Sequence, residues 1–171
     1  MTKTKSLVIT GLLIALSFIG SHITILGSIA FDSLPGFLAA LLLGPLYGAA
    51  IGLIGHMLTA MTSGFPLTMP LHLAIALAMA ITMLGFGYTY KALKDKATVT
   101  ASLTITGAVG ILLNGPVSLG FSMGVLAFMA GKEAALGLLT LLPFLILASM
   151  ANVAISIILF KTLERVWLRT Q

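Results

Sequence analysis

Few side chains in this sequence can carry out chemistry. The chain has four Asp or Glu residues, three His and no Cys. The lack of cysteine excludes disulfides, thiolate metal sites and cysteine nucleophiles. His22, His56 and His72 lack the spacing of metal-ligand pairs and have no carboxylate nearby in the sequence. Because no acid pair or nucleophile–base motif is present either, we expect no catalytic residues, no metal site and no bound cofactor.

A helical face that begins at His72 is the first candidate for binding. At a spacing of three to four residues, this face carries the following side chains: Ala76, Met79, Met83, Phe86 and Tyr90. A stripe of Met and aromatic residues is most often packed core. A histidine above an apolar, polarizable strip also suits a flat heteroaromatic ligand. Both interpretations stay open, and His72 is kept as a candidate ligand-binding residue.

Two asparagines lie in apolar segments, where an amide needs a hydrogen-bond partner. Asn114 precedes Gly115 and Pro116, a break that we expect to end its helix near the outer surface and to free backbone carbonyls there. Its amide could meet a ligand or another helix, and both stay open. Asn152 shares a segment with Ser149 and lies deeper, which favours a bond between helices over a ligand contact.

Asp32 lies just before a short apolar run, in the segment Phe31-Asp32-Ser33-Leu34-Pro35. One interpretation is local: Asp32 or Ser33 caps the helix that follows by accepting from its first free amides. The other is that Asp32 accepts hydrogen bonds from sugar hydroxyls at the mouth of a binding site. The sequence alone leaves both open.

Small residues recur every four positions around His56. The stripe consists of Gly44, Gly48, Gly52, His56 and Ala60. Small side chains on one helix face let two helix backbones approach closely. This pattern favours a packing seam, with His56 hydrogen-bonded inside it, over a ligand role for that histidine.

The composition indicates that most of the chain lies in a lipid bilayer. Of the 171 residues, 59% are hydrophobic and 8% are charged, and the mean hydropathy is +1.17. Spans of roughly 20 residues cross a bilayer, so six spans use about 120 residues and leave no room for a soluble domain. The net charge of +5 does not indicate nucleic acid, because the basic residues lie in thin strips between apolar runs.

Glycine and proline breaks divide the chain into six apolar segments. They cover the following residues: 6–22, 34–43, 45–62, 70–90, 98–117 and 134–160. The Gly44-Pro45 step turns the second and third segments into a packed hairpin. We therefore predict an all-α integral membrane protein, a single domain over residues 1–171 built as a bundle of six transmembrane helices.

The basic residues predict the orientation of this bundle. With six spans, all nine Lys and Arg residues except Lys132 lie on one side, which the positive-inside rule makes cytoplasmic. Both termini are then cytoplasmic. The segment 118–133 is apolar but short and interrupted by Gly120 and Gly124, so we expect an outer loop or re-entrant lid. A seventh span there would place the basic C-terminus outside.

These features resemble the substrate-binding S components of energy-coupling factor (ECF) vitamin transporters. The resemblance rests on six spans in a short chain, cytoplasmic termini and the run LGPLYGAAIG at residues 43–52. Three further segments are similar to the subgroup for α-ribazole, a dimethylbenzimidazole riboside precursor of cobamides. These are residues 32–40, residues 63–67 with His72 downstream, and residues 114–118.

The resemblance implies a transport subunit in a bacterial plasma membrane. It would capture its vitamin from outside under a loop lid, then topple while docked to a transmembrane coupling protein and two ATPases. S components dock through Ala-x-x-x-Ala on the first helix, where this chain has Gly11 and Ala15. The implied substrate-binding residues lie in the outer half of the bundle: Asp32, His72, Asn114 and Asn152, with Met79 as an apolar floor.

Other functions stay open beside this one. An S component for a pyrimidine, pantothenate or a deazapurine would have nearly the same sequence pattern. A metal-uptake component is disfavoured, because related nickel and cobalt proteins carry histidine after the initiator methionine and Thr2 stands there. A membrane-embedded enzyme would need ionisable groups that converge on one site.

Overall fold

The computed structural model describes residues 2–25 and 29–168, and these residues are almost entirely helical. The helices are α1 (Lys3–Gly20), α2 (Leu34–Leu42), α3 (Pro45–Thr62), α4 (Met69–Leu93), α5 (Val99–Leu112), α6 (Ser118–Ala130), α7 (Lys132–Gly137) and α8 (Leu142–Leu168). A π-helical turn, η1 (Leu113–Val117), joins α5 to α6, and a 3₁₀ turn, η2 (Leu138–Leu141), joins α7 to α8. The predicted all-α class is confirmed. Two short antiparallel strands, β1 (Thr24–Ile25) and β2 (Ile29–Ala30), lie between α1 and α2 and were not predicted.

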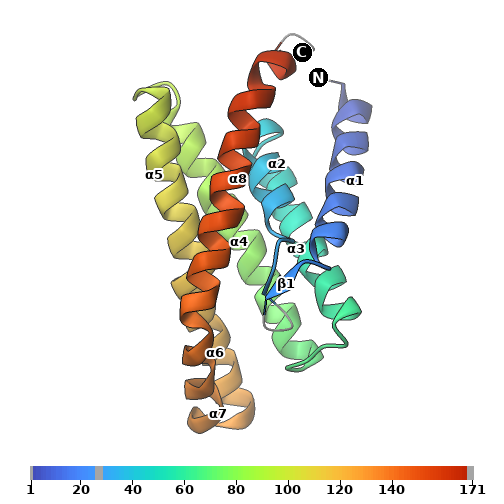
Figure 1. The fold of residues 1–171 in the computed structure, drawn as a ribbon, viewed down its shortest axis with the longest axis vertical. Helices are drawn as coiled ribbons and strands as arrows, with labels where there is room; N and C mark the ends of the chain where they lie inside the picture. Colours follow the sequence, from blue (N-terminus) through green and yellow to red (C-terminus); the bar gives the residue numbers. More distant parts are fainter. Residues whose placement is uncertain (1, 26–28, 169–171) are drawn as a thin grey trace.

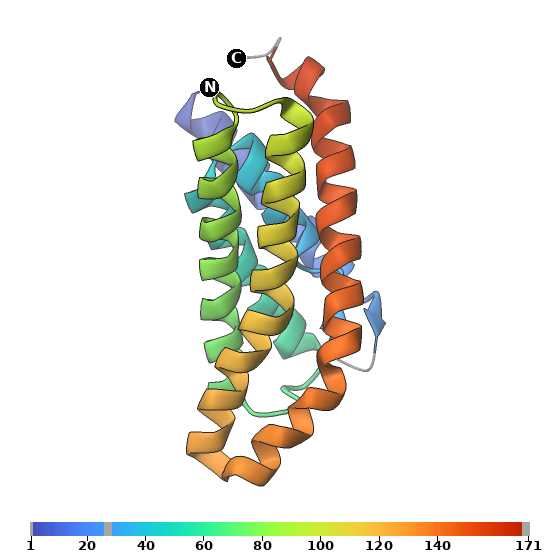
Figure 2. The same ribbon diagram turned by 90° about the vertical axis from the view of Figure 1, so that its left-hand side faces the viewer.

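The helices run along the long axis of the molecule, and both chain termini lie at the same end (Figure 1). Helix α3 packs against α1, α2 and α4, while α8 packs against α2 and α5. A view from the side shows α4, the α5–α6 segment and α8 next to one another over most of the length (Figure 2). The short α2 is therefore enclosed by longer helices.

Four segments of the described chain are long and apolar enough to cross a membrane. They are Lys3–Gly20, Met69–Leu93, Val99–Ala130 and Lys132–Glu164. Helix α2 is not among them, because nine residues at about 1.5 Å each are far shorter than a bilayer core of about 30 Å. Its side chains from Pro35 to Leu41 are buried. A helix that is apolar on every side fits this place in the interior.

The structure corrects the expectation for residues 118–133. This segment is not a loop or a lid but a helix, α6, followed by the start of α7. The expected break at Asn114-Gly115-Pro116 does not end the helix either, because these residues lie in η1. A π-turn accommodates a proline ring and its missing amide while the helix axis continues. The chain reverses instead at Gly131, where φ is +90°.

The seam between α2 and α3 depends on a glycine. A Cβ atom added to Gly48 would lie 2.7 Å from Ala40 Cβ and 2.8 Å from the carbonyl oxygen of Gly36. Farther along the same stripe, a Cβ at Gly52 would lie 3.0 Å from Met83 Cγ of α4. The small residues of α3 thus allow close contact with two neighbouring helices, as the sequence pattern predicts.

We expect Gly48→Ala to destabilise the protein by about 1–3 kcal/mol, because the backbone of α2 must shift to admit the methyl group. The measurement is thermal unfolding of the purified protein in detergent. Gly120→Ala is the matched control, since nothing lies within 4 Å of a Cβ there and alanine is the better helix former. Equal melting temperatures for Gly48→Ala and the unmodified protein would contradict this account of the seam.

Candidate ligand-binding site

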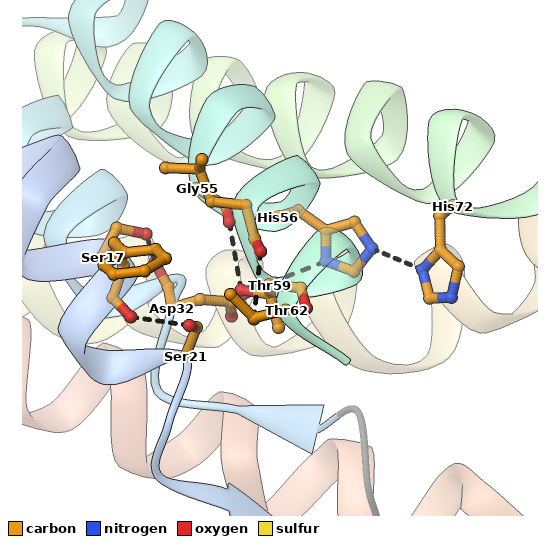
Figure 3. Close-up of polar contacts among 10 residues, drawn as sticks. Ser17, Ser21, Asp32, Gly55, His56, Thr59, Thr62 and His72 are labelled. Carbon is orange, nitrogen blue, oxygen red and sulfur yellow. Dashed lines mark hydrogen bonds and ion pairs between the residues drawn. The ribbon is translucent and has the colours of Figure 1, made fainter. Parts of the chain in front are cut away.

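A buried carboxylate lies where the strand segment meets α2. The Asp32 side chain is 5% exposed, and its Oδ2 atom accepts a hydrogen bond of 2.8 Å from Thr59 Oγ1 on α3. The same Oδ2 lies 3.5 Å from His56 Nδ1 (Figure 3). Ser33 is the N-cap residue of α2 and makes no capping bond through its side chain. The carboxylate of Asp32 therefore contacts α3 across the interior, and the interpretation as a local helix cap is wrong.

The backbone of Asp32 is held as firmly as its side chain. Ser17 Oγ of α1 donates a hydrogen bond of 2.5 Å to the Asp32 carbonyl oxygen. Gly55 of α3 makes room for this contact, because a Cβ at that position would collide with Ser17 Oγ. Helices α1 and α3 thus clamp the residue from two sides.

Two histidines extend the polar chain from Asp32 toward α4. His56 Nε2 lies 3.3 Å from His72 Nδ1, and the two rings are tilted by 30° with centroids 5.5 Å apart. His72 is 1% exposed, and its remaining nitrogen, Nε2, has no hydrogen-bond partner among the described residues. We call this row of Asp32, His56 and His72 the polar relay. The fold thus places a carboxylate beside His56, although no carboxylate lies near this histidine in the sequence.

The two asparagines lie on opposite sides of the contact between η1 and α8. Asn114 Nδ2 donates to Ser149 Oγ at 2.9 Å, and Asn114 Oδ1 is buried without a hydrogen-bond partner in the described part of the chain. Asn152 Nδ2 donates to the Ala148 carbonyl within α8 at 2.9 Å. Asn114 therefore makes a bond between η1 and α8.

Two adjoining chambers lie between these groups. The first has a volume of about 70 Å³, and its lining includes Asp32, Met79, Asn114 and Asn152. The second has a volume of about 80 Å³ and is lined by His72. Both chambers share four lining residues: His56, Ile75, Ser118 and Leu145. All five substrate-binding residues predicted from the sequence therefore surround one pair of chambers.

Several side chains of this site were not predicted from the sequence. His56 was assigned to packing, yet it lines both chambers. Thr59, Ser118 and Ser149 were not predicted as site residues. The spacing of Ser149 and Asn152 on one helix face was a usable signal for α8, whereas nothing local distinguished Thr59.

The two chambers combine polar and apolar walls. Polar atoms from the relay and the asparagines face apolar walls formed by Ile75, Met79 and Leu145. Each chamber is far smaller than the ~300 Å³ or more of typical ligand pockets, so ligand entry must widen the space. Among the described residues, no group of three or more His, Asp or Glu is arranged to hold a metal ion.

The predicted docking residues lie away from these chambers. Gly11 and Ala15 are both exposed on α1. Nothing lies within 4 Å of a Cβ placed at Gly11. The large apolar side chains of Leu7, Leu12 and Ile19 on this helix are also exposed. One side of α1 is therefore not covered by any other described part of the chain.

Comparisons with known proteins identify one family. The family model for "ECF transporter, substrate-specific component" matches residues 5–164. This match includes all the residues that line the two chambers. No curated protein matches the chain, and no solved structure matches it.

We expect His56→Leu to destabilise the fold by about 1–3 kcal/mol, because it leaves the buried Asp32 carboxylate without the His56 ring nitrogen that lies 3.5 Å from it. Thermal unfolding in detergent measures the change. The double variant Asp32→Asn/His56→Leu removes the charge as well and should recover much of the loss. His22→Leu, at an exposed histidine, is the control. If the double variant is no more stable than His56→Leu alone, the contact between Asp32 and His56 does not stabilise the fold in this way.

Proposed function

Because the chain belongs to the family of ECF transporter substrate-specific components, we propose that it captures a vitamin-type molecule from outside a bacterial cell for ATP-driven uptake. The family consists of membrane transport subunits and not of enzymes. Such a component implies a small-molecule substrate and a separate energising module. The substrate, the subunits of that module and the orientation in the membrane are our proposals.

We propose six membrane crossings with cytoplasmic termini. The crossings are α1, the segment that runs through β2 and α2, α3, α4, the α5–α6 segment and the α7–α8 segment, with the short α2 sheltered from lipid by its neighbours. The end of the bundle that carries both termini (Figure 1) is also where α1 begins, α4 passes to α5 and α8 ends. Six described lysines lie in these stretches of the chain: Lys3, Lys5, Lys91, Lys94, Lys96 and Lys161. Lys132 begins α7 at the other end. This asymmetry follows the positive-inside rule, so the chambers would lie in the outer half.

The proposed ligand is α-ribazole, a flat dimethylbenzimidazole joined to ribose. Once the chambers widen, its aromatic part would lie between the apolar walls, with Met79 beneath it, and its ribose hydroxyls would meet Asp32 and Asn114. One observation carries this assignment: Asn114 Oδ1 and His72 Nε2 are buried without partners in the described chain. Buried polar atoms nearly always have partners, so a ligand that supplies the missing bonds belongs between them. Asn152 completes the polar wall from α8.

We expect the protein purified from a cobamide-using bacterium to release α-ribazole on denaturation, detected by mass spectrometry. Titration calorimetry of ligand-free protein should then give binding at micromolar concentration or tighter. Asn114→Ala and Asp32→Ala should each weaken binding by about tenfold or more, since each removes a buried hydrogen bond.

The control for these variants is Gly120→Ala, which lies outside both chambers and should bind normally. Unchanged affinity in both Asn114→Ala and Asp32→Ala would exclude this pose. A different molecule released on denaturation, such as a pyrimidine, pantothenate or a deazapurine, would replace α-ribazole and leave the transport function in place.

We further propose that the uncovered side of α1 docks the coupling protein, which works with two ATPases. Gly11 and Ala15 would let another helix approach α1 closely. Gly11→Leu should abolish co-purification with the energising module and vitamin uptake by cells, while the isolated protein keeps its ligand affinity. Gly120→Leu makes the same change at another open glycine and should keep both. Normal uptake with Gly11→Leu would place the docking surface elsewhere.

A further inference from the structure

We propose that the chain holds an anionic phospholipid at the end of the bundle that carries its termini. The headgroup would occupy a hollow between the turn from α2 to α3 and the last turns of α4. No residue of α1 and no residue of the two chambers lines this hollow. The proposal therefore goes beyond the proposed function and takes from it only the position of the chain in a membrane.

The hollow is formed by a tight turn that packs against α4. Its volume of about 380 Å³ is within the range of ligand pockets, roughly 300–1,000 Å³. Gly44 makes the turn with φ at +112°, and α3 begins directly after it at Pro45. Gly87 of α4 lets the turn come close, because a Cβ there would lie 3.0 Å from Pro45 Cα. The turn and α4 are therefore two fixed walls of one space.

All three tyrosines of the chain line this hollow: Tyr47, Tyr88 and Tyr90. The first comes from α3 and the other two from α4. Tyrosine is enriched at the boundary between membrane and water, because its ring suits apolar surroundings and its hydroxyl bonds to polar groups. This gathering of tyrosines places the hollow at the level of lipid headgroups.

Two lysines give the hollow a positive charge. Lys91 and Lys94 line it, both are exposed, and neither forms an ion pair with a described residue. Helix α3 starts here without a side-chain cap, so its first free amides add a partial positive charge. Two acids, Asp95 and Glu164, interact electrostatically with Tyr90, but neither lines the hollow. The charge of the lining residues suits a phosphate group.

Apolar side chains beside the charged ones favour a lipid over a free anion. Leu42, Leu43 and Leu46 line the same hollow, and Leu46 is 70% exposed. A phospholipid matches both parts, since its phosphodiester would meet the lysines and tyrosine hydroxyls and its acyl chains would meet the leucines. Basic pockets between membrane helices on the cytoplasmic side bind anionic headgroups in this way.

Native mass spectrometry of the full chain tests the preference for an anionic lipid. The protein would be purified in detergent and mixed with equal amounts of phosphatidylglycerol and phosphatidylcholine that carry the same acyl chains. We expect one phosphatidylglycerol to be retained at least about tenfold more often than phosphatidylcholine, because only its headgroup has a net negative charge. Equal retention of the two lipids would overturn the proposal.

A matched pair of lysine variants tests the position of the site. Lys91→Gln/Lys94→Gln removes both cations of the hollow and should remove most of the preference. Lys96→Gln/Lys161→Gln removes two exposed lysines that do not line the hollow and should keep it. An equal loss in both variants would mean that the basic surface as a whole attracts the lipid, which would overturn the site. Thermal unfolding confirms that both variants are folded.

Photo-crosslinking locates the lipid directly. Phosphatidylglycerol with a photoreactive group on its headgroup would be activated in bilayers that contain the full chain, and the attached residues identified by mass spectrometry. We expect attachment at residues 43–47 and 87–94. Tyr47→Phe/Tyr88→Phe keeps the rings and removes two hydroxyls, so it should lower this attachment about threefold. Attachment mainly at other residues would contradict the proposal.

Two further measurements separate a lipid from other occupants. Glycerol 3-phosphate carries a phosphate without acyl chains and should not displace the lipid at equal concentration. Displacement would make the hollow a site for soluble phosphates. Lys91→Gln/Lys94→Gln should co-purify normally with the energising module. Loss of that module with normal retention of phosphatidylglycerol would assign the hollow to a protein partner instead. None of these measurements involves the substrate, so they decide the lipid site whether or not α-ribazole binds.

Discussion

The buried carboxylate of Asp32 is the constraint on which the outer half of the bundle depends. An ionised group in an apolar interior must be surrounded by donors. Thr59 and His56 of α3 meet its side chain, and Ser17 of α1 meets its carbonyl. Through His56 the same group reaches His72 of α4. Asp32, in the segment before α2, thus contacts α1 and α3 directly and is connected to α4 through His56.

The short helix α2 begins two residues after Asp32 and lies in the interior of the bundle. Its nine residues cannot cross a bilayer alone, and its side chains are buried against longer helices. Glycines on α3 let the two backbones approach until no space remains for a methyl group at Gly48. Asp32, just before this packed helix, is 5% exposed.

Features that depend on composition and periodicity could be predicted from the sequence. Contacts between residues far apart in the chain could not. Long apolar runs identified the helices, and His72, Asn114 and Met79 were found as side chains of one region. The prediction of a loop or lid at residues 118–133 was wrong. Gly120, Gly124 and Pro116 indicated helix breaks, but a π-turn at Pro116 lets the helix continue. The pairing of Asp32 with Thr59 joins residues 27 positions apart. No local rule indicates such a contact, and the local rule for helix caps pointed elsewhere.

The polar relay also joins the pair of chambers to the packing of the bundle. A carboxylate beside a histidine commonly prepares a base for proton transfer. Here the far end of the row is His72, which lines the second chamber together with Ser118 and Ser122, and its Nε2 atom has no hydrogen-bond partner in the described part of the chain. The side chains that connect α3 and α4 to the segment before α2 are therefore also side chains that line the proposed site.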